Sequence, residues 1–214
     1  MKYPEDYINK IIQGDCLEVM RELPDKSVDM VLTDPPYGIG ISNKVGGNNK
    51  ALANDYGEQD WDDDIPSKEC FEEMFRISKN QIIFGGNYFV EYLTNSSCWI
   101  VWDKDNTGNF ADCELAWTSF NSAVRKIKHR WNGMLQEDMK NKESRWHPTQ
   151  KPLRVMEWIL HNYSEEGQII LDPFLGSGTT AIACKNLKRK YIGIEISEDY
   201  CKIAQDRLKQ QILL

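Results

Sequence analysis

The stretch VDMVLTDPPYG, residues 28–38, decides the fold, because an apolar strand runs directly into a turn that carries functional groups. Two successive prolines cannot extend a β-ladder, so the strand ends before Pro35. Short apolar runs of this kind alternate with helical patterns along the chain, which is typical of a mostly parallel sheet with crossover helices on both faces. In such sheets ligands bind beyond the carboxyl ends of the strands, where residues 34–37 are expected to lie.

The remaining patterns predict an α/β fold with one seven-stranded, mostly parallel sheet. The strands are expected at residues 8–12, 28–33, 81–84, 98–102, 114–120, 169–171 and 191–194. Helices are expected at residues 17–23, 66–78, 87–94, 153–163, 179–187 and 198–212. Residues 1–214 then form a single domain with two long connections, a candidate mobile loop at 38–65 and a basic, aromatic insert at 121–146. Connections of that length are uncommon unless they are functional or disordered.

The composition fits a folded chain of 214 residues, of which 41% are hydrophobic and 28% are charged. Enough apolar residues are present to bury a core, which excludes wholesale disorder. No apolar run reaches the roughly 18 residues of a membrane-spanning helix, and the first ten residues carry no apolar signal core. We therefore expect a soluble, cytoplasmic protein with no membrane partner.

The six cysteines occur without any C-x-x-C pair, and only three histidines accompany them. A structural zinc site needs clustered ligands and a disulfide scaffold needs denser cysteines, so we expect reduced cysteines and no metal site. The net charge of −7 argues weakly against a nucleic-acid partner. The charge is uneven, however, because residues 55–73 are strongly acidic and residues 121–151 are strongly basic. A local basic face could still contact a polyanion.

A second stretch, IILDPFLGSGTT at residues 169–180, runs from a buried strand through a glycine-rich turn into a helix. Glycines allow a ligand to approach the backbone, and the helix N-terminus offers unpaired N–H groups. No lysine follows Gly178, so this turn is not the phosphate-binding loop of nucleotide hydrolases. Glu195 ends the next strand, where a carboxylate can bind ribose hydroxyls. The alternative role of Glu195 is a helix-start acid before Ser197.

The turn Asp34-Pro35-Pro36-Tyr37 combines two hydrogen-bond acceptors with an aromatic ring. The prolines fix the backbone and hold the Pro35 carbonyl outward, and the Asp34 carboxylate stands beside it. The Tyr37 ring could stack on a planar base. For an isolated motif of this kind, the alternative is a proline turn that merely closes a strand, with Asp as the turn former.

The Asp-Pro-Pro-Tyr motif, followed by Asp-Pro-Phe-x-Gly-Ser-Gly-Thr, resembles the amino-group DNA methyltransferases that use S-adenosylmethionine. Two further stretches are similar to motifs of that family: Gly14-Asp15-Cys16 after the first strand, and HPTQKP at residues 147–152. The catalytic motif precedes the cofactor motif, as in the permuted group called the beta class. The resemblance covers nearly the whole chain and implies a Rossmann-like, S-adenosylmethionine-dependent methyltransferase fold.

The resemblance implies a role for each matching residue. The residues that act on the base are Asp34, Pro35, Pro36 and Tyr37. The residues that bind S-adenosylmethionine are Asp15, Cys16, Asp34, Thr149, Gln150, Lys151, Asp172, Pro173, Phe174, Gly176, Ser177, Gly178, Thr179 and Glu195. Asp15 would face the cofactor's adenine, and Thr149 and Lys151 would lie near its amino-acid end.

The chemistry of amine methylation fits the first of these sets. An exocyclic amine is a poor nucleophile because its lone pair is delocalised into the ring. Asp34 and the Pro35 carbonyl can each accept one N–H and so direct the lone pair toward the methyl group, which is electrostatic positioning. The base must leave the duplex to reach them and would stack on Tyr37. Methylation at ring carbon five would instead need a Pro-Cys nucleophile, and the chain contains no Pro-Cys pair.

The insert at 121–146 is the expected contact with double-stranded DNA. Its run of basic residues, Arg125, Lys126, Lys128 and Arg130, supplies phosphate partners with aromatic neighbours. A solvated charged face is the alternative. Family members commonly carry a larger target-recognition region, so sequence selectivity here would be short, relaxed or shared with a partner.

The expected function is methyl transfer to the N6 of a flipped adenine in DNA, by a site-specific, adenine-N6 methyltransferase. Transfer to the N4 of cytosine is the nearest alternative. In the family, Asp as the first motif residue favours adenine and Ser favours cytosine. A catalytically silent DNA-binding module of the same fold, a nicotinamide oxidoreductase and an RNA substrate stay open. The resemblance also suggests a homodimer.

Overall fold

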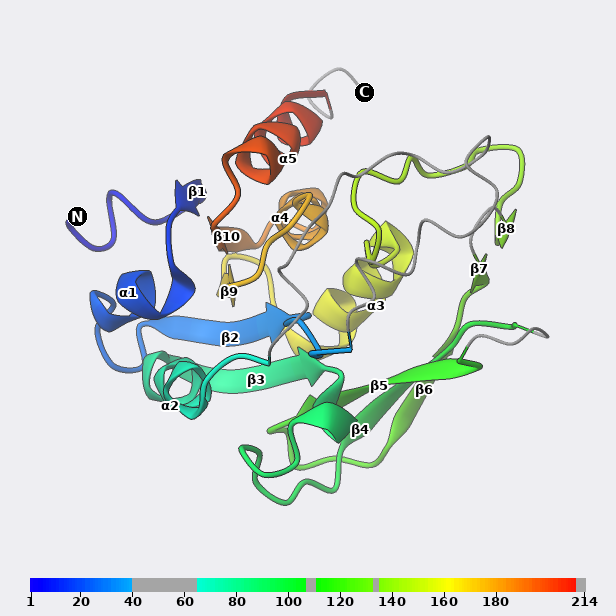
Figure 1. Ribbon diagram of the computed structural model, residues 1–214, viewed down its shortest axis with the longest axis horizontal. Helices are drawn as coiled ribbons and strands as arrows, with labels where there is room; N and C mark the ends of the chain where they lie inside the picture. Colours follow the sequence, from blue (N-terminus) through cyan, green and yellow to red (C-terminus); the bar gives the residue numbers. More distant parts are fainter. Residues whose placement is uncertain (40–64, 107–110, 133–134, 211–214) are drawn as a thin grey trace.

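The computed structural model describes residues 1–39, 65–106, 111–132 and 135–210, and one eight-stranded sheet organises them (Figure 1). The strands follow the order β1 (Lys10–Gln13), β10 (Lys190–Glu195), β9 (Ile169–Asp172), β2 (Val28–Thr33), β3 (Ser78–Phe84), β5 (Cys113–Thr118), β4 (Trp99–Asp103) and β6 (Arg125–Lys128). Within this described part of the chain, β5 alone is antiparallel to its neighbours in the sheet, and all other pairs in it are parallel. The expected α/β fold with a mostly parallel sheet is confirmed.

Helices cover both faces of this sheet, because successive side chains of a strand point to opposite faces. The helices are α1 (Cys16–Arg21), α2 (Lys68–Ile77), α3 (Leu153–Tyr163), α4 (Thr179–Asn186) and α5 (Glu198–Gln210). Val31 of β2 packs in a core cluster with residues of α1 and α2. Met30 and Leu32 of the same strand pack in a second cluster with residues of α3 and α4. The result is a three-layer arrangement with β2 near its centre (Figure 1).

The parallel half of the sheet determines where a site can form. The strands β1, β10, β9, β2 and β3 run in one direction, so their carboxyl ends meet at one edge. Within it, β2 and β9 are direct neighbours, with Met30 opposite Ile170 and Val31 opposite Leu171. The two motifs that follow these strands in the sequence therefore lie side by side at that edge.

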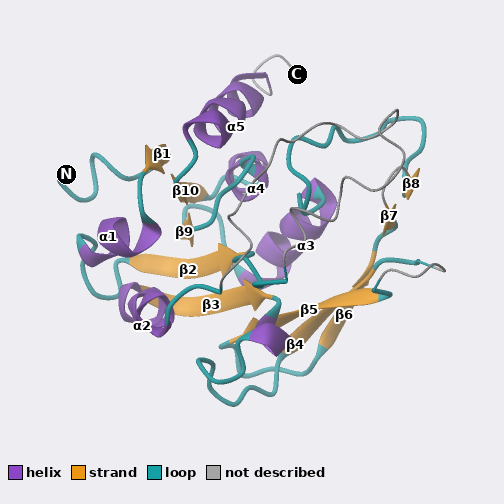
Figure 2. Cartoon of the chain, in the orientation of Figure 1, coloured by secondary structure: helices purple, strands orange, loops and turns teal. Residues whose placement is uncertain are grey.

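The sheet has one strand more than the seven expected, because part of the insert at 121–146 joins it. β6 is an edge strand that pairs in parallel with β4 (Figure 2). Its side chains do not alternate between buried and exposed, since Ile127 is buried while Arg125, Lys126 and Lys128 are all exposed. A single apolar residue among basic ones carries little strand signal, and this is why the strand was missed. Further along the insert, β7 (Trp131–Asn132) and β8 (Leu135–Gln136) form a separate two-stranded sheet.

The helix expected at 87–94 is wrong. Only a short 3₁₀ turn, η1 (Gly86–Tyr88), forms there, followed by further turns. Gly85 precedes it in the left-handed region, at φ +67°. Tyr88 and Val90 are exposed, so the segment lacks the continuous apolar face that stabilises a helix in a small domain.

The candidate mobile loop at 38–65 lies almost wholly outside the described residues, which include only its two ends at 38–39 and 65. Most of the acidic stretch at 55–73 lies outside them as well. Among the helices that the structure describes, none is both long and apolar enough to cross a membrane.

Candidate active site

A cavity of about 330 Å³ lies at the carboxyl edge of the sheet, where the turns after β1, β2, β9 and β10 converge. Most of the residues predicted for the site line it, namely Asp15, Cys16, Asp34, Pro36, Thr149, Lys151, Asp172, Pro173, Phe174, Gly176, Ser177, Thr179 and Glu195. The lining does not include Pro35, Tyr37, Gln150 or Gly178. The fold thus brings four separate sequence motifs to one cavity.

The glycine turn after β9 is held in place by the Glu195 carboxylate. Gly176 N–H donates to Glu195 Oε2 at 2.7 Å, and Ser197 N–H donates to Oε1 at 2.9 Å. Gly178 has φ +90°, and a Cβ there would stand 2.7 Å from the Cβ of Ala204, so the turn requires glycine. Burial raises the pKa of Glu195. Glu195 therefore lines the cavity and also holds the glycine turn. Its hydrogen bond from Ser197 N–H agrees with the alternative role of an acid at the start of a helix.

Asp172 ties the two motif-bearing strands together. Its Oδ1 accepts hydrogen bonds from Thr33 Oγ1 at 2.7 Å and from Phe174 N–H at 3.1 Å. Its Oδ2 accepts one from Thr180 Oγ1 at 2.5 Å. Burial raises the pKa of Asp172 to about 6, although these hydrogen bonds oppose the rise. The residue joins β9 to β2 and α4, so it acts at least partly as a structural brace of the cavity floor.

Asp15 also has a local structural partner. It is the N-cap of α1, and its Oδ1 accepts a hydrogen bond from Glu18 N–H at 3.0 Å. Capping of this kind is typically worth about 1 kcal/mol of helix stability. The neighbouring Cys16 has its Sγ 3.7 Å from Cys70 Sγ. Both residues still line the cavity, so capping and ligand contact are compatible roles for Asp15.

The Asp34 carboxylate has a partner for each oxygen. Tyr37 donates its phenol O–H to Oδ1 at 2.5 Å, and the Lys151 ammonium pairs with Oδ2. Burial raises the pKa of Asp34, and the Lys151 charge opposes that rise. A buried carboxylate that accepts hydrogen bonds from a phenol and an ammonium is a strong acceptor site. The structure therefore gives Lys151 a second contact beyond its predicted place near the cofactor.

The ring of Tyr37 is fixed by its surroundings. It stacks on Tyr88 with ring centroids 4.8 Å apart and an interplanar angle of 15°. A Cβ at Gly85 would stand 2.2 Å from Tyr37 Cε1, so this position must be glycine for the ring to fit. Tyr88 was not among the predicted site residues, because its segment was expected to form an ordinary helix. Its sequence signal is an aromatic residue two positions after the Gly-Gly pair at 85–86.

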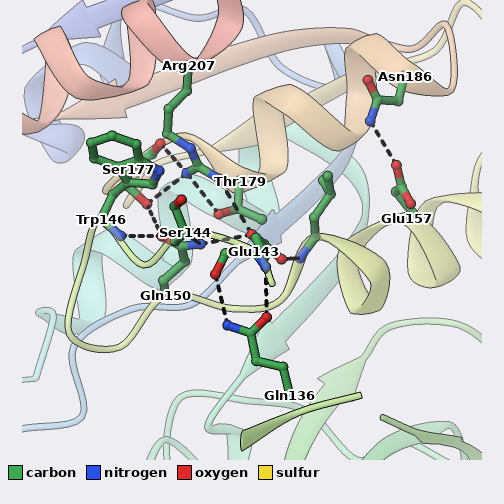
Figure 3. Close-up of polar contacts among 11 residues, drawn as sticks. Gln136, Glu143, Ser144, Trp146, Gln150, Glu157, Ser177, Thr179, Asn186 and Arg207 are labelled. Atoms are coloured by element: carbon green, nitrogen blue, oxygen red, sulfur yellow. Dashed lines mark hydrogen bonds and ion pairs between the residues drawn. The ribbon is translucent and has the colours of Figure 1, made fainter. Parts of the chain in front are cut away.

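Gln150 was predicted to bind the cofactor, but its amide is fully engaged elsewhere (Figure 3). Its Oε1 accepts from Trp146 N–H at 2.9 Å and from Ser177 Oγ at 3.1 Å. Its Nε2 donates to Glu143 Oε1 at 2.8 Å and to Ser144 O at 3.1 Å. An amide can make four hydrogen bonds and this one makes all four. Gln150 thus connects the end of the insert to the glycine turn.

Arg207 of α5 holds the same turn from the other side (Figure 3). Its Nη1 donates to Ser177 O at 2.6 Å and to Ser177 Oγ at 3.0 Å, and its Nη2 lies 3.6 Å from Glu143 Oε1. Arg207 was not among the predicted site residues, because one arginine in a polar helix carries no signal that its guanidinium is buried. Glu114 and Lys104 were not among the predicted residues either. Glu114 pairs with both Lys104 and Lys151.

The basic run predicted to bind DNA lies at the opposite edge of the sheet from β1. Lys126 Nζ is 3.2 Å from Asp103 Oδ2, and Lys128 Nζ is 2.8 Å from Asp105 Oδ1. Arg130 also pairs with Asp105. These pairs are exposed, so each is worth about 0–1 kcal/mol and can exchange for another anion at little cost. Arg125 is exposed as well.

Among the residues that the structure describes, no group of three or more His, Cys, Asp or Glu side chains is arranged to hold a metal ion. The cavity is lined instead by carboxylates, a lysine and backbone groups of a glycine turn. Those groups are suited to an organic ligand with hydrogen-bonding groups.

Sequence comparison gives the chain a set of related proteins. A family model described as DNA methylase matches residues 68–206. The chain is 28% identical over 249 residues to the Type II methyltransferase M.HinfI of Haemophilus influenzae, covering 96% of this chain and 69% of that protein. It is also 28% identical over 257 residues to the Type II methyltransferase M2.DpnII of Streptococcus pneumoniae, covering 96% and 92%.

Structure comparison agrees with these matches. The chain resembles the crystal structure of the M1.HpyAVI–SAM complex with a TM-score of 0.57 and 26% sequence identity. The match covers 93% of this chain and 99% of that one. The likeness therefore extends over nearly the whole of both chains.

Proposed function

Because this chain belongs to the family of DNA methylases whose model matches residues 68–206, we propose that it methylates the N6 amine of adenine in DNA. Membership makes it an S-adenosylmethionine-dependent methyltransferase of exocyclic amines in DNA; the choice of adenine is the finer proposal. The observation that carries it is the Asp34 carboxylate, which follows the carboxyl end of β2 and directly precedes Pro35 in the sequence. Asp34 lines the same cavity as the glycine turn and Glu195.

The cavity residues fit S-adenosylmethionine. Gly176, with φ +54°, presents the backbone of the turn to the cavity. Gly176 and Glu195 stand together on the cavity wall, where a carboxylate can bind ribose hydroxyls. Asp15 and Cys16 line the side nearest β1. When bound, the cofactor supplies an electrophilic methyl group on a sulfonium.

Asp34 and Pro35 provide the chemistry at the amine. The Asp34 carboxylate and the Pro35 carbonyl each accept one N–H, so the amine lone pair turns toward the methyl carbon. The carboxylate also stands ready to take the proton that the methylated amine loses. Since Tyr37 donates its phenol to Asp34 Oδ1, the ring must release that bond or share the oxygen when the target amine arrives.

Adenine is favoured over cytosine by the residue type at position 34. In the amino-group family, Asp in this place accompanies adenine methylation and Ser accompanies cytosine methylation. Asp34 pairs with the Lys151 ammonium, whose charge lowers the pKa of Asp34 against the effect of burial and so favours the carboxylate that accepts from an amine. The exposed basic run on β6 supports double-stranded DNA as the partner. A cytoplasmic location and a homodimer stay predictions.

The test is the identity of the modified nucleoside. Purified protein is incubated with S-adenosylmethionine and unmethylated duplex DNA, and the DNA is digested to nucleosides and analysed by mass spectrometry. We expect N6-methyldeoxyadenosine, formed at least roughly 100-fold more slowly by the Asp34→Ala variant. If N4-methyldeoxycytidine is found instead, cytosine rather than adenine is the substrate. If neither the DNA nor an RNA control contains a methylated nucleoside, the proposal is overturned.

A further inference from the structure

A buried line of four charged side chains runs from the catalytic carboxylate away from the cavity. Lys104 pairs with Glu114 Oε1, Glu114 Oε2 lies 3.1 Å from Lys151 Nζ, and Lys151 pairs with Asp34 Oδ2. The four side chains are between 7% and 20% exposed. Two cations alternate with two carboxylates, so the group is neutral as a whole.

Glu114 holds the central place in this line. It lies on β5, opposite Trp102 of β4 in the register, which brings its carboxylate beside Lys104. Lys151 stands between two carboxylates and lies 5.1 Å from the Phe84 ring centroid. Without the charge of Glu114, Lys151 would keep one carboxylate partner instead of two.

We propose that Glu114 is a positioning residue for methyl transfer, which fixes the Lys151 ammonium between two carboxylates and so holds Asp34 in place to accept an N–H of the target amine. The inference rests on the proposed function, since Asp34 is the acceptor. Nothing in the sequence motifs pointed to Glu114. It does not line the cavity, so it acts through Lys151 rather than on the base.

The charges around Asp34 determine the direction of a pH test. The groups that face it are Tyr37 after β2, Lys151 before α3, Glu114 on β5 and Asp172 on β9, with Lys104 behind Glu114. Burial raises the pKa of Asp34, Lys151 lowers it, and the Glu114 charge raises it. Removing that charge should lower the pKa of Asp34.

Glu114→Gln is the direct variant, because it keeps the shape and removes the charge. Single-turnover methyl transfer is measured from about pH 5 to pH 9 at saturating DNA and S-adenosylmethionine. We expect the rate at neutral pH to fall roughly 10- to 100-fold, the scale of a misplaced catalytic group. We also expect the acid limb of the profile to move to lower pH. Glu114→Asp should leave the limb where it is in the wild type and retain more of the rate.

Asp112→Asn is the matched control, since it removes an exposed carboxylate two residues away. Its profile should overlay that of the wild type. A Glu114→Gln profile with its limb unmoved would overturn the proposal, whatever the rate, because the limb position does not depend on the folded fraction. If Glu114→Gln does not fold, Glu114→Asp decides: we expect its rate to fall measurably, and a wild-type rate would overturn the proposal. A wild type that methylates no nucleic acid would instead refute the proposed function.

Discussion

Two groups of lysine–carboxylate pairs lie at different depths in this protein. Lys151 at the Asp34 site is 7% exposed, whereas Lys126 and Lys128 on β6 are 62% and 58% exposed. A buried pair is costly to break, because one charge is left without compensation. An exposed pair contributes about 0–1 kcal/mol and exchanges with solvent ions. The same chemical pair can therefore fix a catalytic acceptor in one place and stay available to DNA phosphates in another.

The largest effect is expected at the buried group. Asp34→Ala should lower methyl transfer by at least roughly 100-fold, because one preorganised acceptor at developing charge is typically worth about 3–4 kcal/mol. Cofactor affinity should stay within a few-fold, since the glycine turn and Glu195 are untouched. Tritiated-methyl incorporation and calorimetric titration measure the two quantities. Near-normal turnover would remove Asp34 from the mechanism.

The next effect concerns the cofactor wall. Glu195→Ala removes the acceptor of the Gly176 and Ser197 N–H groups as well as the predicted ribose contact. We expect S-adenosylmethionine binding to weaken by about 1.5–3 kcal/mol, the range for a hydrogen bond to a charged group. Glu198→Ala, which removes an exposed carboxylate at the start of α5, is the control. Unchanged binding in Glu195→Ala would leave the residue with its capping role alone.

The exposed group is tested by salt dependence. Replacing Arg125, Lys126, Lys128 and Arg130 by Ala should weaken DNA binding and flatten the slope of log affinity against log salt. Each DNA phosphate that the protein no longer neutralises reduces the magnitude of that slope by about 0.9.

The control for this quadruple variant is a triple one. Lys188, Lys202 and Lys209 also stand in exposed ion pairs, away from β6, and are replaced by Ala. Only the β6 variant should flatten the slope. Equal slopes of log affinity against log salt in the wild type and both variants would show that the basic run is a solvated surface that does not contact DNA.

The smallest effect comes from the acids that pair with this run. Asp103→Asn combined with Asp105→Asn frees Lys126, Lys128 and Arg130 from their partners. DNA affinity should rise by a few-fold, because exposed pairs are worth about 0–1 kcal/mol. Fluorescence anisotropy at two salt concentrations is sufficient to detect this. An unchanged affinity would mean that the two carboxylates do not compete with DNA phosphates for these basic side chains.

The elements of the parallel sheet could be predicted from the sequence because their signals are local. The strands that lead to Asp34 and to the glycine turn each contain a short apolar run, residues 30–32 and residues 169–171, and each is followed by a turn marked by Pro or Gly. Since parallel strands end at one edge, the meeting of the two motifs followed from topology alone. The prediction of a shared cavity lined by Asp34, Glu195 and the glycine turn was possible for that reason.

The remaining features depend on contacts between distant residues. Glu114 lies in an ordinary strand pattern, and only the fold brings it to Lys151, 37 positions later in the sequence. β6 carries one buried residue, Ile127, and its pairing with β4 compensates for a sequence with weak strand preference. The helix expected at 87–94 fails for another reason, because Tyr88 and Val90 are exposed and the segment has no continuous apolar face to pack against the core.

The division of roles between the buried and the exposed groups is tested by comparing two variants of the protein. The single-turnover rate and the DNA dissociation constant are measured for Asp34→Ala and for the quadruple Ala variant of the β6 run. We expect Asp34→Ala to lose the rate and keep DNA affinity, whereas the β6 variant should lose DNA affinity and keep the saturated rate. Loss of both quantities in both variants would contradict this expectation, because catalysis and DNA binding would then not be divided between the buried and exposed groups.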